Sequence, residues 1–422
     1  MDSKVKKKQN KTNAIENLED YSKEELIQKI KTLSAHNFQL KNLLSKSTAT
    51  ASGEKPVKQT KPFDFSRYQF QHIALHFLYL GWNYKGFVVQ EDTTDTVEYH
   101  LFQALQRTKL IPDRESSNYH RCGRTDKGVS SFGQVISLDL RTNVLKADPY
   151  ESSSPLNYCK LLNRELPDDI QCVGWSAVDE SFSARFDCKS RTYRYYFPRG
   201  QLNLERMKIA TEKLIGSHDF RNFCKMDVGN GVVEFIRNIE DINIESISQN
   251  ESDYDMYVIT LKGKAFLWHQ IRCIMGVLFL IGQGNEVPEV IDELLNVAKN
   301  PRKPAYSMAS EIPLNLFYCE YDDLDWNYDQ EALTQVIEKL NNQWTFQAVK
   351  SELIKGMVTS LISLNRKNDE EDSTYKCLSE HLVQGVRCKK YQPLLERQSC
   401  HSLEHKIEHF TKRRKLQIEN KK

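Results

Sequence analysis

The amino-acid sequence predicts an α+β fold in which most strands pair antiparallel. Residues 73–79 and 136–140 alternate in polarity with the period of a strand, whereas Val97, Leu101 and Leu105 recur with the period of a helix. Segments of the two kinds follow one another without the regular strand–helix–strand order that builds a parallel sheet. We therefore expect a mainly antiparallel sheet flanked by helices.

The globular part of the chain is expected to begin at Phe63, where the composition becomes richer in apolar residues. Asp95 or Thr96 can cap the first helix, and Pro167–Asp169 predicts a turn. The later expected elements are helices over 204–214, 266–281 and 288–298, a strand over 256–261, and a weaker helical signal over 353–361. These elements divide into an N-terminal half, 63–180, a C-terminal half, 181–330, and a partly helical, partly disordered basic tail, 331–422.

Residues 1–62 are expected to be basic and largely disordered, because lysines and small polar residues dominate their composition. A short coiled-coil helix over about 22–45 interrupts this segment. Its seam, with alternating steps of four and three, consists of Leu26, Ile30, Leu33, Asn37, Leu40 and Leu44. The pattern favours a parallel dimer, and a helix packed on the protein's own core fits it equally well.

Composition limits the classes of function. The 422 residues carry 59 Lys and Arg against 57 Asp and Glu, so any attraction to nucleic acid has to be local. No run of about 18 apolar residues is present, and we expect no membrane span. The ten cysteines are never closer than 11 residues apart, which excludes CxxC motifs. We therefore expect reduced thiols and no structural zinc site.

The segment His120–Val129 contains the most informative residue, Asp126. Gly123 and Gly128 favour a turn that presents a side chain, and Arg124 and Lys127 are expected to lower the pKa of the Asp126 carboxyl. An ionised Asp in a preformed turn is a candidate nucleophile. A solvated hairpin loop would have a similar composition.

Two further segments combine cations with aromatic residues. In 185–197, one face of an expected strand would carry Arg191, Tyr193 and Tyr195, and the other would carry Arg194. Such a strand can bind phosphates and stack on an unpaired base, or it can simply be half-buried.

The second segment lies in the helix expected over 266–281. Arg272 needs a carboxylate partner there, for which Asp126 is the candidate. His269 is either an RNA contact or an ordinary core or surface histidine.

Five segments together resemble the TruA family of pseudouridine synthases. In chain order they are Tyr79–Phe87, Gly123–Asp126, Phe182–Phe186, Arg191–Tyr195, and Ala265–His269 with Arg272. Details at Asp219–Asp227 and Leu280–Gly284 look like the eukaryotic branch, which modifies tRNA positions 38 and 39 in the anticodon arm. Unlike many bacterial relatives, this chain has Lys127 after the Asp, where they have Ala.

The resemblance implies a catalytic core of two α+β halves joined into one sheet, with a positively charged cleft and neither cofactor nor metal. Asp126 would be the catalytic Asp, Arg124 would help to take the nucleotide out of the stack, Tyr193 would stack on the uracil, and Arg272 would pair with Asp126. The expected RNA-binding residues are Lys127, Arg185, Arg191, Arg194 and His269.

The expected partner is tRNA, bound by a homodimer in the nucleus and cytoplasm. The basic run at 412–415 permits nuclear entry, although a solvated terminus would look the same. Two rival functions are a catalytically silent tRNA-binding protein and an Asp-dependent metal hydrolase. The second needs further ligands near Asp126, and the nearest acidic residues, Glu115 and Asp139, are too distant in sequence to form a metal motif.

Overall fold

The computed structural model describes residues 63–147, 155–226, 232–247, 255–364, 379–384 and 390–419, with side chains up to Lys412. The expected coiled coil over 22–45 and most of the basic run at 412–415 lie outside this description. None of the described helices is long and apolar enough to cross a membrane.

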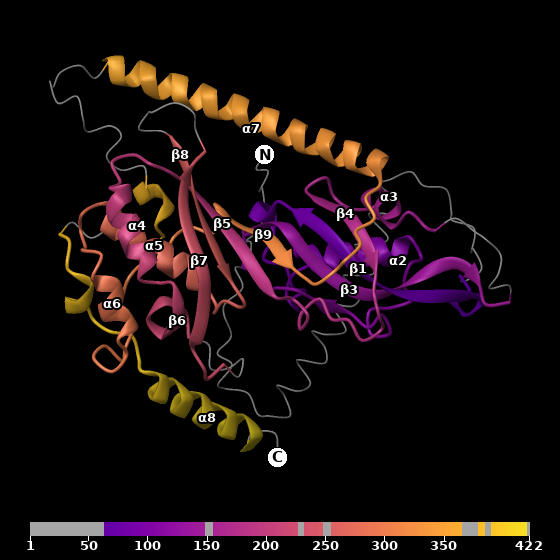
Figure 1. The fold of residues 1–422 in the computed structure, drawn as a ribbon, viewed down its shortest axis with the longest axis horizontal. Coiled ribbons are helices and arrows are strands. Elements are labelled where there is room, and N and C mark those ends of the chain that lie inside the picture. Colours follow the sequence, from indigo (N-terminus) through magenta and orange to yellow (C-terminus); the bar gives the residue numbers. More distant parts are fainter. Residues whose placement is uncertain are drawn as a thin grey trace, which may run out of the picture. The chain divides into compact units, whose positions relative to one another are not determined.

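The described strands form one nine-stranded sheet in the order β4-β1-β3-β9-β5-β8-β7-β6, with β2 paired to β3 (Figure 1). Their bounds are β1 Tyr68–Tyr79, β2 His120–Arg121, β3 Ser130–Leu145, β4 Ile170–Ala177, β5 Ser190–Pro198, β6 Gly216–Asp219, β7 Ile236–Ser246, β8 Met256–Gly263 and β9 Leu314–Glu320. All neighbours pair antiparallel except β3 and β9, which are parallel. The predicted α+β class with a mainly antiparallel sheet is confirmed.

Helices α2, Val97–Arg107, and α3, Tyr158–Asn163, pack on the sheet beside β1, β3 and β4. Thr96 caps α2, because its hydroxyl accepts a hydrogen bond from the backbone N–H of Tyr99. The expected apolar face of α2 is buried with the inward side chains of β1, including Ile73 and Phe77. This cluster is the core of the first part of the sheet.

A second core lies between β5, β7 and β8 and the helices α4, Leu204–Glu212, α5, Gln270–Gly282, and α6, Val290–Leu295. Helix α5 is buried almost throughout, as its apolar sequence predicts. It begins at Gln270 rather than at the expected Phe266, because His269 has a left-handed backbone, φ 60°, which cannot continue a helix. Trp268 and His269 therefore project from a turn.

Helix α7, Gln330–Leu364, is far longer than the 353–361 segment that the sequence indicated (Figure 1). Its first turns contact β4 through Val336, which packs with Leu78 and Val173. Many apolar residues of its last five turns are exposed. Helix α8, Leu403–Glu419, follows the short turns η6, Ser379–Leu382, and η7, Leu394–Glu396.

The loop between β1 and α2 lies directly against the backbone that leads into β3. It starts with the short turn η3, Gly81–Asn83, and a Cβ at Gly81 would lie 1.9 Å from the Val129 carbonyl oxygen. The Gly81 N–H donates to the Ser130 hydroxyl at 3.0 Å. Glycine is therefore required here for close approach of two backbones.

We expect Gly81→Ala to lower the free energy of unfolding by about 2 kcal/mol or more, because the backbone has to shift to admit the methyl group. Gly356→Ala is the matched control, since nothing lies within 4 Å of a Cβ in that exposed helical position. There the change should be neutral or stabilise by about 1 kcal/mol. Denaturant unfolding measures both, and equal effects would contradict the contact.

Candidate active site

Asp126 lies on the loop that joins β2 to β3, as the sequence predicts. Three contacts hold this loop against the segment that follows β1: Phe87 N–H donates to the Thr125 carbonyl at 3.1 Å, Gly128 N–H donates to the Tyr84 carbonyl at 3.1 Å, and the Tyr79 and Thr125 hydroxyls are 2.7 Å apart. Gly128 has φ 79°, and a Cβ there would lie 2.5 Å from a side-chain carbon of Glu311. The loop is therefore built to present Asp126.

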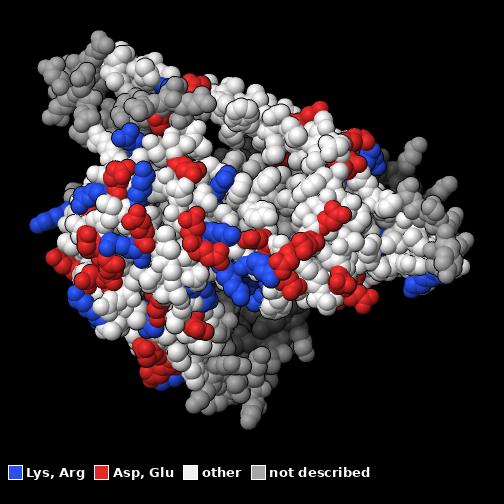
Figure 2. All heavy atoms as spheres, viewed as in Figure 1, with Lys and Arg blue, Asp and Glu red and all other residues white. Residues whose placement is uncertain are grey.

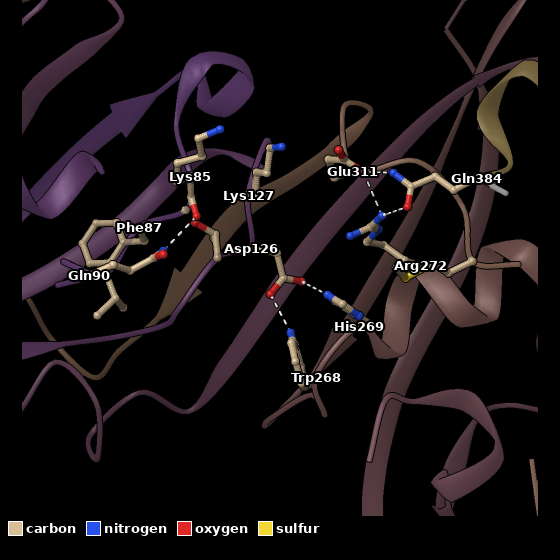
Figure 3. A pocket seen from close by; sticks show the side chains of 14 residues that line it. Lys85, Phe87, Gln90, Asp126, Lys127, Trp268, His269, Arg272, Glu311 and Gln384 are labelled. Atoms are coloured by element: carbon tan, nitrogen blue, oxygen red, sulfur yellow. Dashed lines mark hydrogen bonds and ion pairs between the residues drawn. The ribbon is translucent and has the colours of Figure 1, made fainter. Parts of the chain in front are cut away.

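The carboxylate of Asp126 faces residues of the turn that precedes α5 (Figure 3). The indole Nε1 of Trp268 donates to its Oδ1 at 3.0 Å, and His269 Nε2 lies 3.4 Å from its Oδ2. The Asp126 side chain is 26 % exposed. The turn before α5 thus supplies a hydrogen-bond donor to one oxygen and places an imidazole near the other, and the carboxylate remains accessible.

The pKa of Asp126 is raised above its ordinary value, chiefly because burial disfavours the charged form. The charge of Arg272 and the hydrogen bond from Trp268 act in the opposite direction. The expectation that Arg124 and Lys127 would lower this pKa is wrong, since both side chains are exposed and Lys127 points away from the carboxylate in Figure 3. Burial and charged groups from other parts of the fold, with Arg272 foremost, therefore set the pKa of Asp126.

Arg272 is buried in α5 and has a carboxylate partner, as predicted, but that partner is Glu311 instead of Asp126. A guanidinium nitrogen of Arg272 lies 2.8 Å from Glu311 and 2.7 Å from the Gln384 side-chain oxygen, while its Nε donates to the Ala309 carbonyl at 2.8 Å. Gln384 also donates to Glu311. Arg272 therefore acts on Asp126 through its charge, with its hydrogen bonds made elsewhere.

His269 is neutral at physiological pH. Burial and the charges of Arg272, Lys225 and Lys303 lower its pKa to about 4. The neutral ring carries one proton, which on Nε2 can donate to Asp126. Nδ1 is then the acceptor, and it is buried without a hydrogen-bond partner.

Asp126 lies in a cavity of about 510 Å³, a volume suited to a single nucleotide. One wall comes from residues 85–90 and the Asp126 loop, and the other from Trp268, His269 and Arg272. Met308, Glu311 and Gln384 complete the lining. A larger cavity of about 960 Å³ shares His269, Met308 and Gln384 with it. Its lining includes five cations, Lys225, Lys303, Lys390, Arg397 and Lys406.

The structure assigns different surroundings to the other predicted residues. Tyr193 is half-buried on β5, with its ring 5.3 Å from that of Phe266. Arg124 and Arg185 are exposed, and partial burial followed by the charges of Arg121 and Arg185 lowers the pKa of Arg124. Arg194 packs its guanidinium 3.5 Å from the Phe317 ring centroid.

Arg191 connects three segments of the chain. Its guanidinium donates to the carbonyls of Lys264, Cys122 and Arg185 at 2.6, 2.8 and 3.1 Å. These bonds use guanidinium N–H groups of Arg191 that we expected to contact RNA. Figure 2 shows Lys and Arg side chains gathered near the middle of the face in view, with acidic groups between them. Positive side chains are thus concentrated in one place on this face, while the net charge of the whole chain is only +2.

Sequence reasoning did not assign a role to Trp268, Lys225, Glu311 or Gln384. Lys225 lies over the Trp268 ring, 4.3 Å from its centroid, and so adds a cation to the wall that bonds Asp126. Trp268 and Lys225 were visible as parts of quoted motifs, but no local pattern marked Glu311 or Gln384. The contacts that give these residues their roles span 39 to 142 residues of sequence.

These features define an RNA-modifying enzyme of the pseudouridine synthase class, and comparison with known proteins agrees. The family described as tRNA pseudouridine synthase matches residues 210–322. The tRNA pseudouridine(38/39) synthase of Bos taurus is 42% identical, covering 93% of this chain and 87% of its own. The Homo sapiens enzyme of that name is 41% identical, and the match covers 93% of this chain and 86% of the human one. The Saccharomyces cerevisiae enzyme of that name is 39% identical, and the match covers 82% of this chain and 84% of the yeast one.

The chain belongs to the tRNA pseudouridine synthase family, known as the TruA family. It is an isomerase that acts on tRNA.

We expect Arg272→Met to lower the free energy of unfolding by about 3–5 kcal/mol, because it leaves Glu311 unpaired beside a buried helix. Arg107→Met removes one partner of the exposed pair with Glu165 and should cost less than about 1 kcal/mol. Adding Glu311→Gln to Arg272→Met should recover part of the loss. Chemical denaturation of the four proteins tests this, and an undisturbed Arg272→Met protein would contradict the pairing.

The low pKa of His269 predicts a pH dependence of stability. An unfolded histidine titrates near pH 6.5, so the folded state binds fewer protons than the unfolded state between about pH 6.5 and 4. The contribution of His269 is therefore complete above pH 6.5 and is lost as the pH falls toward 4. Wild type should lose more stability between pH 7 and 5 than His269→Gln, whereas the exposed His409→Gln should follow wild type. Identical curves for all three would refute the assignment.

Proposed function

We propose that this enzyme converts uridine to pseudouridine at positions 38 and 39 in the anticodon arm of tRNA, with Asp126 as the catalytic group. The relatives named tRNA pseudouridine(38/39) synthase match this chain over most of their own length. The observation that carries the assignment of Asp126 is its position. It is an accessible carboxylate in a nucleotide-sized cavity between the two parts of the sheet.

The reaction is an isomerisation that conserves every atom. The bond between N1 and C1' breaks, the uracil turns, and a bond forms between C5 and C1'. The proton on C5 leaves and N1 gains a proton, so no external reactant is consumed. Asp126 would initiate the cleavage of the N1–C1' bond and hold the intermediate while the base turns.

The surroundings of Asp126 suit such a step. Burial raises the pKa of the carboxyl and so makes the carboxylate more basic than an exposed Asp. Trp268 holds one oxygen by a hydrogen bond, His269 lies near the other, and the charge of Arg272 favours the ionised form. A uridine that enters the cavity would displace these donors and leave the carboxylate facing the sugar.

The cationic surface beside the cavity fits an RNA backbone. Lys225, Lys303, Lys390, Arg397 and Lys406 line the larger cavity, which meets the first at His269. Arg124, in the Asp126 loop, lies near Arg185. Exposed Phe186 packs beside Arg185 with its ring centroid 5.1 Å from the guanidinium. Phosphate contacts from these groups would position the arm, and Arg124 would support the flipped nucleotide.

Tyr193 is proposed to stack on the uracil, as the family resemblance implies. Its ring lies within β5, where it packs on the second core and on a small cluster that includes Ala184 and Leu316. Tyr193 contributes no atom to the lining of the 510 Å³ cavity, so the base would have to reach beyond that cavity to meet it.

We expect Asp126→Asn to abolish pseudouridine formation while tRNA affinity stays within a few fold of wild type. The substitution removes the nucleophile but no phosphate-binding cation. Pseudouridine is mapped by carbodiimide adduct and primer extension on unmodified tRNA, and affinity is measured by filter binding. The control is Glu115→Gln, an exposed acid upstream of the loop.

Three outcomes are informative. Modification of the anticodon arm by wild type and Glu115→Gln alone supports the proposal. Activity in Asp126→Asn would overturn the role of Asp126. Tight tRNA binding by wild type without any modification would favour the silent binding protein.

We further propose a homodimer that works in the nucleus and cytoplasm. The heptad pattern over 22–45 and the exposed apolar side chains of α7, such as Leu353, Met357 and Leu361, support association of two copies. The basic run at 412–415 supports nuclear entry. Light scattering of the purified chain measures its mass in solution, and imaging of a fluorescent fusion locates it. A monomeric mass or exclusion from the nucleus would refute the respective proposal.

A further inference from the structure

Three buried cysteines meet behind the loop that carries Asp126. The Sγ atom of Cys122 lies 3.2 Å from that of Cys319 and 3.4 Å from that of Cys188, and all three sulfur atoms fall within 4.8 Å of one another. The three residues are at most 5 % exposed. Cys122 and Cys319 are 197 residues apart in sequence, so only the tertiary fold brings them together. Nothing in the proposed reaction uses these thiols.

A positive charge lies beside the cluster. The guanidinium of Arg191 donates to the Cys122 carbonyl at 2.8 Å. A nearby cation favours thiolate over thiol. Three buried thiolates in contact need a further cation among them.

The spacing of the sulfur atoms fits such a cation. An ion that holds three thiolates at about 2.3 Å separates the sulfur atoms by about 3.8–4.0 Å, in tetrahedral or trigonal geometry. The Cys122 sulfur therefore has to move about half an ångström from each partner. Thiolate is a soft ligand that selects zinc(II) and copper(I) over magnesium or calcium.

We propose that Cys122, Cys188 and Cys319 bind a thiophilic metal ion, zinc(II) or copper(I). The ion displaces the thiol protons and leaves a complex with a net negative charge. Arg191 compensates this charge from beside the cluster, where its guanidinium is fixed by the carbonyls of Cys122 and Arg185.

The ion would have a structural role. Cys122 directly precedes Gly123–Asp126, Cys188 follows the exposed Arg185–Asp187 segment, and Cys319 lies on β9, the strand that joins the two parts of the sheet. One ion would therefore fix the catalytic loop, a cationic loop and the central strand to one another. We expected no zinc site because the sequence has no CxxC motif. This cluster needs no such motif, because the fold brings together cysteines that are far apart in sequence.

A second cysteine pair provides a contrast inside the same chain. Cys159 and Cys172 are buried with their sulfur atoms 3.0 Å apart. Burial raises the pKa of Cys172, and among the described residues no third thiol joins this pair. It should bind no metal, so Cys159→Ser is a matched control for the loss of one buried sulfur.

The test is the metal content of untagged full-length protein, measured by mass spectrometry of the elements as isolated and after reconstitution with zinc(II) or with copper(I). We expect about one ion per chain in wild type and in Cys159→Ser, and at least a tenfold loss in Cys319→Ser. The two reconstitution arms show which metal is retained against a chelator. X-ray absorption of the wild-type protein should count three sulfur ligands at about 2.3 Å.

Other outcomes would overturn the proposal. The proposal is wrong if wild-type protein takes up no ion in either reconstitution. It is also wrong if the bound ion has fewer than three sulfur ligands. If Cys319→Ser fails to fold, the sulfur count on wild type still decides. Denatured, metal-free protein should titrate as ten thiols, and eight would indicate a disulfide in place of the metal site.

Discussion

The parallel pairing of β3 with β9 is the constraint on which the active site depends. Ser130 faces Asn315 and Ser131 faces Leu316, so the two strands start at the same edge of the sheet. The Asp126 loop leads into β3 and Glu311 lies just before β9. Parallel alignment therefore brings the reacting carboxylate next to the Arg272–Glu311 pair. An antiparallel pairing would place these groups at opposite ends of the strands.

Burial and charge oppose each other at Asp126. Enclosure makes the carboxylate costly to ionise, and the cations that compensate come from the second core, mainly through Arg272. Arg272 is itself neutralised by Glu311, whose charge raises the pKa of Asp126 again. The pKa of Asp126 thus depends on the charges of Arg272, Glu311 and Lys225, which lie on three different segments, while its hydrogen-bond donor, Trp268, is neutral. This arrangement keeps the carboxylate reactive without a direct ion pair to arginine.

The sequence pattern predicted the elements whose formation depends mainly on residues close together in the chain. The alternation in β1 and β3, the cap at Thr96 and the loop position of Asp126 follow from side-chain periodicity and glycine placement. The start of α5 was wrong because the left-handed backbone of His269 leaves no signature in composition. The partner of Arg272 was wrong because Glu311 and Gln384 approach it across a distance in sequence that no periodicity encodes.

The contacts of Gln384 also bear on how the protein is made. Ribosomes release a chain from its N-terminus, and its parts can fold in that order. Asp126, Trp268 and Arg272 emerge early, but the residue that bonds both Arg272 and Glu311 lies more than a hundred residues beyond α5. The pocket therefore stays open on one side until a segment more than a hundred residues beyond α5 has been synthesised. A nascent chain that has folded only as far as α5 presents the reacting carboxylate in an incomplete pocket.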